Sequence, residues 1–317
     1  MMRDWADAND GFYSTFRTSE DIDVAFDRTS CMLRRPARYT LIVETRHEDP
    51  PAPGGLQVVL AADAVAQNAV EIILDASGSM LQMLGKQRRM DIARTTLSDL
   101  VENVLPAGTP FAFRAFGTRM ANCESDLLVR LQPLNRAQVG ALVRKLKATN
   151  LAKTPLGASL RAVAEDLKGV KGQKVVVLLT DGEETCGGDP AAAIQYLKEQ
   201  GLDVRVNIVG FAVDQKELKS SFERWAELGG GRFFDAKNAQ ELSNAMTEAL
   251  RPKFQVTDGT GSVVAEGTAD GAPVELPVGV YTVRVLTSPV RTFDRVRIVS
   301  QQQKKLEVRA AGDGASR

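Results

Sequence analysis

Two nearly continuous apolar runs constrain the fold of this chain more than any other feature. They are Val70–Leu74 and Val175–Leu179. A strand with apolar residues at successive positions is covered on both faces, which is typical of a mostly parallel sheet with helices on either side. Amphipathic helical patterns separate and follow the two runs. The sequence therefore predicts a doubly wound α/β domain at 67–251.

The helices of this domain are expected where a start signal precedes an apolar stripe and a breaker follows it. One stripe runs from Met90 to Val104, and later helices are expected to start at Asn135, Thr154, Asp189, Asp214 and Asn238. Shorter strand signals fill the gaps at 111–116, 127–131, 204–210 and 232–234. This alternation favours an open sheet with helices on both faces.

The two ends of the chain have the apolar patterns of β-strands, without the alternating helices of the middle. From residue 253 the apolar period changes to two, which predicts a small antiparallel β-sandwich at 252–310, followed by a disordered tail at 311–317. Segment 1–66 is a β-rich N-terminal part with a Pro-rich linker. Its expected strands are Ile22–Phe26, Arg38–Thr45 and Gly55–Leu60. These strands form either a truncated β-domain or a region that leans on the C-terminal module.

Composition excludes several functions. The 40 Lys and Arg residues balance 40 Asp and Glu residues, so no basic surface for nucleic acid is expected. No apolar stretch approaches the roughly 20 residues of a membrane-spanning helix. The single histidine, His47, lies in a charged linker, where solvation is a more ordinary role than catalysis. We expect no enzyme activity.

The residues that carry chemistry follow the two buried runs. Asp75, Ser77 and Ser79 come directly after the first run, Asp181 follows the second, and Thr154 stands at a helix start. Their oxygens are hard ligands that suit Mg²⁺, Mn²⁺ or Ca²⁺. Ligand sites of open α/β sheets form at the carboxyl ends of the strands, where these loops converge. Each residue also has an ordinary structural role, as a turn residue or as a helix N-cap.

This set of residues resembles the metal-ion-dependent adhesion site of von Willebrand factor type A domains. That site combines an Asp-x-Ser-x-Ser loop, a threonine in a later loop and an aspartate in a Thr-Asp-Gly turn, and the resemblance covers residues 68–250. It implies that Ser77, Ser79 and Thr154 bind the cation through hydroxyls, while Asp75 and Asp181 act through water or directly. A cation held mainly by neutral oxygens keeps positive charge, so an Asp or Glu of a protein partner completes its coordination.

Two cysteines bear on the location of the protein. The segment Thr185–Pro190 and an upstream cysteine resemble bacterial, often exported members of the family. The resemblance implies a Cys123–Cys186 disulfide and a periplasmic, secreted or cell-surface location. The chain as given starts without a signal peptide, so a cytoplasmic protein with reduced thiols stays open. The C-terminal module resembles immunoglobulin-like or PEGA-like β-domains.

The favoured function is therefore cation-dependent, non-catalytic protein binding, in adhesion or as a scaffold. Two alternatives stay open. One is an intracellular adaptor that works with an AAA+ ATPase, for which reduced Cys123 and Cys186 would be expected. The other is a metal-assisted hydrolase. The sequence leaves open the partner, the oligomeric state, the preferred ion and the resting state of the site.

Overall fold

A computed structural model describes residues 2–9, 13, 15–32, 50–61 and 68–309. The chain divides into two compact units, Met1–Pro50 and Pro51–Arg317. The strand expected at Arg38–Thr45, the residue His47 and the tail at 311–317 lie outside the described residues. Across the described ranges, no helix has both the length and the apolar character needed to span a membrane.

The described part of the first unit contains two helices. They are α1 (Met2–Ala8) and α2 (Ser19–Met32), so the strand expected at Ile22–Phe26 is wrong. Apolar and acidic or small residues alternate there, which imitates a strand, but a capping interaction starts a helix instead. The Asp21 carboxylate accepts hydrogen bonds from the backbone N–H groups of Arg17 (2.9 Å) and Thr18 (3.0 Å), which pair otherwise free donors at the helix start.

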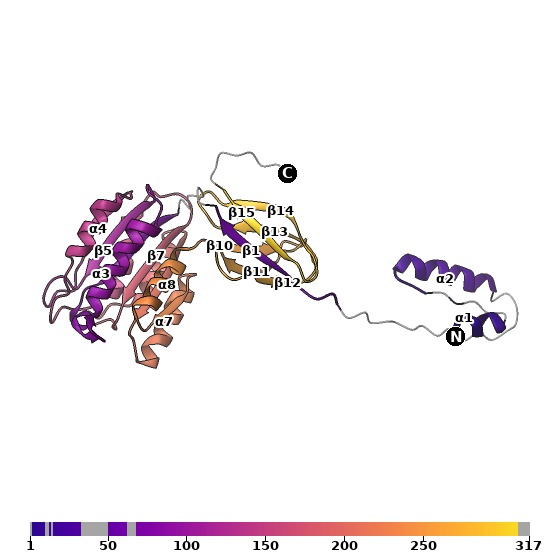
Figure 1. Ribbon diagram of the computed structural model, residues 1–317, viewed down its shortest axis with the longest axis horizontal. Helices are drawn as coiled ribbons and strands as arrows, with labels where there is room; N and C mark the ends of the chain where they lie inside the picture. Colours follow the sequence, from indigo (N-terminus) through magenta and orange to yellow (C-terminus); the bar gives the residue numbers. More distant parts are fainter. Residues whose placement is uncertain (1, 10–12, 14, 33–49, 62–67, 310–317) are drawn as a thin grey trace. The chain divides into compact units, whose positions relative to one another are not determined.

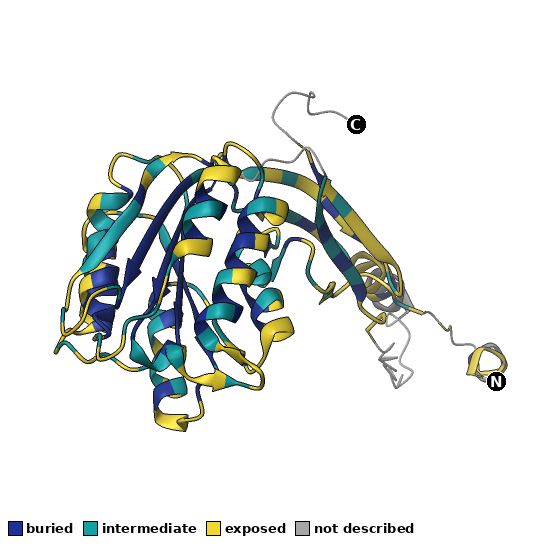
Figure 2. Ribbon diagram, turned by 60° about the vertical axis from the view of Figure 1, so that its left-hand side comes forward, coloured by how far each residue is buried: buried dark blue, intermediate teal, exposed yellow. Residues whose placement is uncertain are grey.

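The second unit contains the expected α/β sheet. Its strands lie in the order β6-β5-β2-β7-β8-β9. Their bounds are β2 (Ala69–Asp75), β5 (Pro110–Phe116), β6 (Ser125–Pro133), β7 (Lys174–Thr180), β8 (Val204–Phe211) and β9 (Phe233–Ala236). Only the edge strand β6 runs antiparallel to its neighbour among these described strands. Every residue of β2 and β7 is buried, as the two apolar runs predict (Figure 2).

Helices cover both faces of this sheet (Figure 1). One face packs against α3 (Arg89–Asp99), the π-helical turn η2 (Leu100–Val104), α4 (Arg136–Lys145) and α8 (Ala239–Leu250). The other face packs against α5 (Leu156–Asp166), α6 (Pro190–Glu199) and α7 (Lys216–Leu228). The doubly wound fold class is therefore confirmed. The chain leaves β2 toward one face and β7 toward the other, so the sheet has its switch point between these two strands.

Three of the expected helix starts are capped by the side chains that the sequence indicates. Asn135, Asp189 and Asn238 each accept a hydrogen bond from the backbone N–H three residues later. Thr154 and Asp214 do not cap a helix, because Pro155 and Gln215 occupy those N-cap positions. The helix N-cap role that the sequence suggests for Thr154 is therefore wrong.

A β-sandwich combines β1, which precedes the α/β domain in sequence, with six strands that follow it. One sheet has the order β11-β10-β13-β14 and the other β12-β1-β15, and both share one apolar core. Their bounds are β1 (Gly54–Leu60), β10 (Lys253–Thr257), β11 (Val263–Thr268), β12 (Val274–Leu276), β13 (Gly279–Val285), β14 (Arg291–Ile298) and β15 (Gln303–Val308). Strand β1 pairs parallel with β15, so the module is not wholly antiparallel. The sequence left open whether the N-terminal strands form a truncated β-domain or lean on the C-terminal module. Strand β1 does the latter, because it pairs with β12 and β15.

A buried charge cluster lies beneath α5 on the sheet. Arg114 on β5 donates to the Asp166 carboxylate from Nε (2.8 Å) and Nη2 (2.5 Å), while Glu71 on β2 is fully buried 3.6 Å from the same guanidinium. Neither carboxylate oxygen of Glu71 has a hydrogen-bond partner within the described part of the chain. Burial, followed by the neighbouring charge of Asp166, raises the pKa of Glu71 well above its ordinary value of 4.5.

Glu71 should make the stability of the protein depend on pH. The folded state holds this proton more tightly than the unfolded chain, so the contribution of Glu71 is fully present below about pH 4.5 and is lost as the pH rises through the folded pKa. We expect Glu71→Gln to gain stability over the wild type as the pH rises from 5 to 8, by about 1–3 kcal/mol. Urea unfolding at several pH values measures this. The exposed control Glu165→Gln should show no such trend, and a constant difference for Glu71→Gln would contradict the assignment.

Candidate metal centre

Four of the five predicted ligands form one hydrogen-bonded chain at the carboxyl ends of β2 and β7. Asp75 ends β2 and is fully buried. The Ser77 and Ser79 hydroxyl oxygens lie 3.1 Å apart, and Ser79 Oγ donates to Asp181 Oδ1 at 2.5 Å. The structure therefore brings together residues separated by about a hundred positions in sequence, as the switch point of the sheet predicts.

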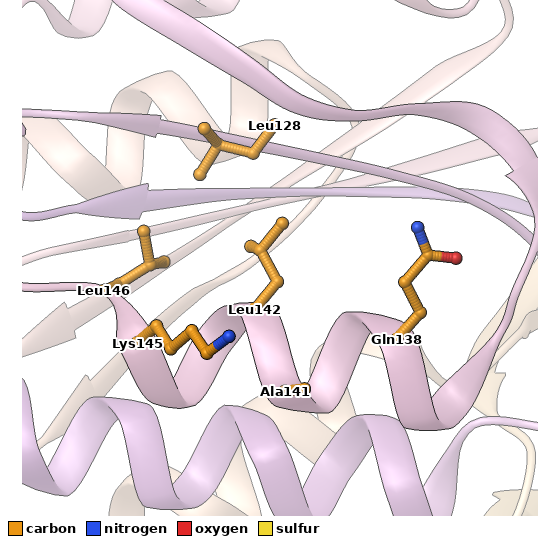
Figure 3. A pocket seen from close by; sticks show the side chains of 6 residues that line it. All are labelled: Leu128, Gln138, Ala141, Leu142, Lys145 and Leu146. Atoms are coloured by element: carbon orange, nitrogen blue, oxygen red, sulfur yellow. The ribbon is translucent and has the colours of Figure 1, made fainter.

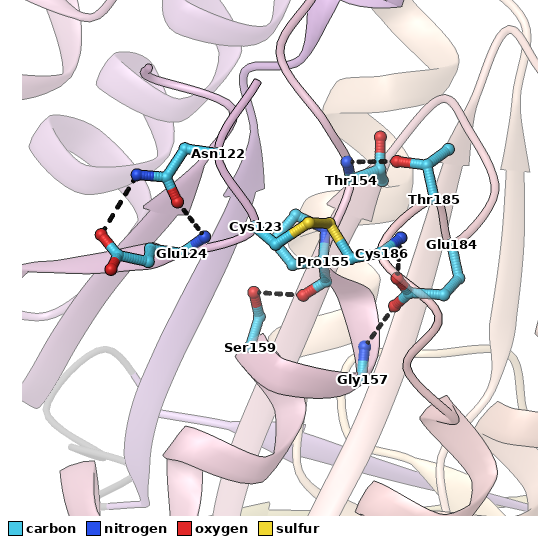
Figure 4. Close-up of a disulfide and its surroundings, with 10 residues drawn as sticks. All are labelled: Asn122, Cys123, Glu124, Thr154, Pro155, Gly157, Ser159, Glu184, Thr185 and Cys186. Atoms are coloured by element: carbon cyan, nitrogen blue, oxygen red, sulfur yellow. Dashed lines mark hydrogen bonds between the residues drawn. A yellow bond between two sulfur atoms is a disulfide. The ribbon is translucent and has the colours of Figure 1, made fainter. Parts of the chain in front are cut away.

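Thr154 lies on the neighbouring loop. Its backbone N–H donates to Thr185 Oγ1 (2.7 Å), and its carbonyl accepts from the Thr185 N–H (3.1 Å), so it is fastened to the loop that follows Asp181 (Figure 4). The earlier part of the same loop is held by the Thr149 N–H, which donates to the Ala76 carbonyl (3.0 Å). Thr154 is 5% exposed, and within the described ranges its hydroxyl has no hydrogen-bond partner.

The turn that carries Ser77 depends on a glycine in another loop. Gly117 follows β5 with a φ of +72°, and a Cβ atom there would lie 2.3 Å from the Ser77 backbone nitrogen. A side chain is therefore excluded both by conformation and by space. The Ala76 N–H donates to the Phe116 carbonyl (2.8 Å) next to this point. The loops after β2 and β5 consequently hold each other in place.

Residues that the sequence analysis did not single out complete the site. Thr180 donates from Oγ1 to Asp75 Oδ2 at 2.6 Å, and the Ser77 N–H donates to Asp75 Oδ1 at 2.8 Å. Arg89, the first residue of α3, donates from Nη1 to Asp181 Oδ2 at 2.9 Å. The position of Thr180 directly before Asp181 was a usable signal. The pairing of Arg89 was not, because no sequence spacing links it to Asp181.

The electrostatics of the site suit a cation. Burial, followed by the charge of Asp181, raises the pKa of Asp75 from 3.8 to about 7. Burial also raises the pKa of Asp181, against the opposing effects of Ser79 and Arg89. Of these two buried carboxylates, only Asp181 is paired with the Arg89 guanidinium, and buried charges are costly unless they are paired or coordinate a metal. The donor set consists of oxygen atoms alone, which fits Mg²⁺, Mn²⁺ or Ca²⁺.

Carboxylates alone do not define this centre. No group of three or more His, Cys, Asp or Glu residues that could hold a metal occurs in the described ranges. Besides the two carboxylates, the oxygen atoms gathered here are the hydroxyls of Ser77 and Ser79. An open pocket of about 450 Å³ lies elsewhere, between β6 and α4 (Figure 3). It is lined by Leu128, Gln138, Ala141, Leu142, Lys145 and Leu146. None of the predicted ligands lines it.

A disulfide joins two of the loops around the site. Cys123, between β5 and β6, is bonded to Cys186, which follows the Asp181 turn (Figure 4). The expected pairing is therefore confirmed. Glu184 organises the same loop, because its carboxylate accepts from the backbone N–H groups of Gly157 (2.8 Å) and Cys186 (2.6 Å). The loop after β7 is thus fixed to the start of α5 and to the loop after β5.

Comparison with known proteins defines the family. The model of the von Willebrand factor type A domain matches residues 70–248, and the chain belongs to this family. The uncharacterized protein YwmD of Bacillus subtilis is 34% identical over 58% of this chain and 86% of its own length. A von Willebrand factor type A structure from Catenulispora acidiphila covers 84% of this chain and 76% of its own, with a TM-score of 0.51 and 16% identity.

Another solved structure in this comparison is proximal thread matrix protein 1 from the mussel byssus, with a zinc-occupied metal-ion-dependent adhesion site. It is 20% identical, covers 58% of this chain and 45% of its own, and has a TM-score of 0.46.

Arg89 should compete with a bound cation for Asp181. Its guanidinium already supplies positive charge to this carboxylate, so Arg89→Gln is expected to tighten Mg²⁺ binding by about tenfold, the worth of one charge-assisted hydrogen bond. Isothermal titration calorimetry measures the affinity. Arg88→Gln, which removes an exposed charge from the adjacent position, is the matched control. Weaker binding by Arg89→Gln would mean that Arg89 positions Asp181 for the cation instead.

Loss of the disulfide should destabilise the α/β domain. The bond spans 63 residues of sequence, and closing a loop of this length is expected to contribute about 2–4 kcal/mol to the free energy of unfolding. The double variant Cys123→Ser/Cys186→Ser should lose this amount in urea unfolding. The wild type with dithiothreitol should match the double variant, and the double variant itself should not respond to the reductant. Equal stability in all samples would contradict the expectation.

Proposed function

We propose that this protein binds a partner protein through a divalent cation held by Asp75, Ser77, Ser79, Thr154 and Asp181, and that it is not an enzyme. The observation that carries the proposal is the hydrogen-bonded chain from Ser77 through Ser79 to Asp181, next to the buried Asp75. It supports a metal-ion-dependent adhesion site with Mg²⁺, Mn²⁺ or Ca²⁺ as the ion.

The hydroxyl and carboxylate side chains would have different roles in such a site. The three hydroxyls of Ser77, Ser79 and Thr154 would hold the ion, and the two carboxylates would balance its charge from the side of the sheet. When bound, the cation supplies a Lewis-acidic centre for one external carboxylate. An Asp or Glu side chain of a protein partner is therefore the expected ligand. A general acid–base role is not supported, since the carboxylates already engage Thr180, Ser79 and Arg89.

We propose further that the protein is bacterial and works outside the cytoplasm. A disulfide between two surface loops supports this, because such bonds persist in oxidising compartments and are rare where thiols are kept reduced. The same bond weakens the case for an intracellular adaptor of an AAA+ ATPase. The balanced charge of the chain gives no support to a nucleic-acid partner.

Asp75→Ala should abolish cation binding while leaving the fold intact. The substitution removes the buried carboxylate at the base of the site, so titration calorimetry with Mg²⁺ or Mn²⁺ should lose its binding heat. A crosslinking pull-down with and without chelator should lose its cation-dependent partner. The control Asp99→Ala removes an exposed carboxylate at the far end of α3 and should behave as wild type. Retention of both binding events by Asp75→Ala would overturn the proposal.

A further inference from the structure

Segments that follow or adjoin the loops of the candidate cation site carry exposed apolar side chains. Met83, Met120 and Leu151 are 59%, 64% and 70% exposed; we call these three residues the rim. Met83 follows Ser79 in the β3–β4 hairpin (Met83–Leu84 and Gln87–Arg88). Exposed methionine and leucine side chains beside a polar centre are typical of a surface that binds another protein.

The backbone places two rim residues against the site. The Leu151 nitrogen lies 3.3 Å from the position of a Cβ atom on Gly78, between Ser77 and Ser79. The Leu151 carbonyl accepts from the Ala121 N–H at 3.3 Å, next to Met120. Leu151 and Ala121 both have positive φ values, +55° and +48°, a strained conformation for these residues. The loops thus pay a conformational cost where they expose Leu151, which is consistent with a binding role.

The rim and the cation together specify the chemistry of an occupant. The occupant must present a carboxylate that no other group holds, with large apolar side chains beside it. A segment that has apolar side chains alone would leave the cation without its ligand, and an acidic segment alone would leave the rim exposed to water.

Helix α2 of this chain has this chemistry. Ile22 and Phe26 lie one turn apart and are 42% and 61% exposed. Asp23 is exposed and is a neighbour of Phe26 on the helix surface, three residues before it. Asp21 is occupied in its own helix cap, whereas Asp23 has no hydrogen bond or ion pair with any described residue.

Helix α2 is only partly covered, because Ala25 is buried whereas Ile22 and Phe26 are exposed. It has 14 residues, and helices of this length are marginal in water unless an apolar face is buried. Its exposed Ile22 and Phe26 would gain that burial on the rim.

The chain enters the second unit at the end farthest from the site. Gly54 starts β1 beside Val299 and Ile298, and Ile298 pairs with Gly279 at the start of β13. The α/β domain connects at the other end of the sandwich, where β10 starts at Lys253 opposite Val285. The candidate site lies at the carboxyl edge of the α/β sheet, beyond that connection. Gly54 and the candidate site therefore lie at opposite ends of the second unit.

We propose that the site and its rim bind α2 of a second copy of this chain, with Asp23 as the carboxylate that completes the cation's coordination and Ile22 and Phe26 packed on Met120 and Leu151. This inference rests on the proposed function of the site and adds its partner. The contact is heterologous, so it leaves a free site at one end of each assembly and a free helix at the other.

Sedimentation velocity of the full chain tests the proposal. The wild type should associate beyond a monomer in Mg²⁺, in proportion to protein concentration, and return to a monomer with EDTA. Asp23→Asn and the pair Met120→Ser/Leu151→Ser should each weaken the association at least tenfold. The controls Glu20→Gln, which removes another exposed carboxylate of α2, and Val280→Ser, an exposed apolar residue of the sandwich, should associate as wild type.

A mixture of two inactive variants gives a sharper test. Asp75→Ala keeps the helix and lacks the site, and Asp23→Asn keeps the site and lacks the carboxylate. Each should be monomeric alone, and an equal mixture should form dimers and nothing larger, because only one productive contact is possible. No dimer in the mixture would overturn the proposal.

Calorimetry on the same samples distinguishes cation binding from self-association. If the wild type binds Mg²⁺ but does not associate, the proposed function stands and the inference fails. If the wild type binds no cation, both fail. If Mg²⁺ protects α2 from hydrogen exchange without increasing the mass, the helix occupies the site of its own chain, and the second copy is excluded.

Discussion

The structure depends on how two buried carboxylates are accommodated at the switch point of the sheet. Asp75 ends β2 and Asp181 directly follows β7, and both carboxylates are buried, so neither can be reached freely by water. Their oxygens are paired with Thr180, Ser77, Ser79 and Arg89. The loops after β2, β5 and β7 then take the conformations that these hydrogen bonds require. Gly117 and the disulfide belong to this arrangement, because both fix loops that bear on it.

Sequence patterns predicted the α/β domain well because its strands and helix starts depend on residues that are close together in sequence. Apolar runs such as Val175–Leu179 report a strand that is covered on both faces, and side-chain caps such as Asn135 and Asn238 report helix starts. Four of the five predicted ligands come together because parallel strands end at one edge of the sheet. Arg89 could not be predicted as the partner of Asp181, since the contact joins residues of two separate elements and has no periodic signature.

The N-terminal region was harder to predict, for two different physical reasons. The alternation of Ile22, Val24 and Phe26 has the period of a strand, and the capping contacts of Asp21 outweigh it by starting a helix. Strand β1 has a correct local pattern, but its neighbours β12 and β15 follow more than two hundred residues later. Pairing over such a separation is decided by burial of Leu56 and Val58 in a shared core, which a local pattern cannot report.

The parallel pairing of β1 with β15 gives the molecule a mechanical property. The chain enters β1 at Gly54 and leaves β15 at Val308, and the two strands are in register from Gly55 with Gln303 to Leu60 with Val308. A force that pulls these two points apart loads all the rungs of this ladder together in shear, instead of opening them one at a time. The α/β domain is inserted between the two strands in sequence and lies off this load path. Tension along the chain is therefore carried by the sandwich, while the loops of the candidate site stay unstrained.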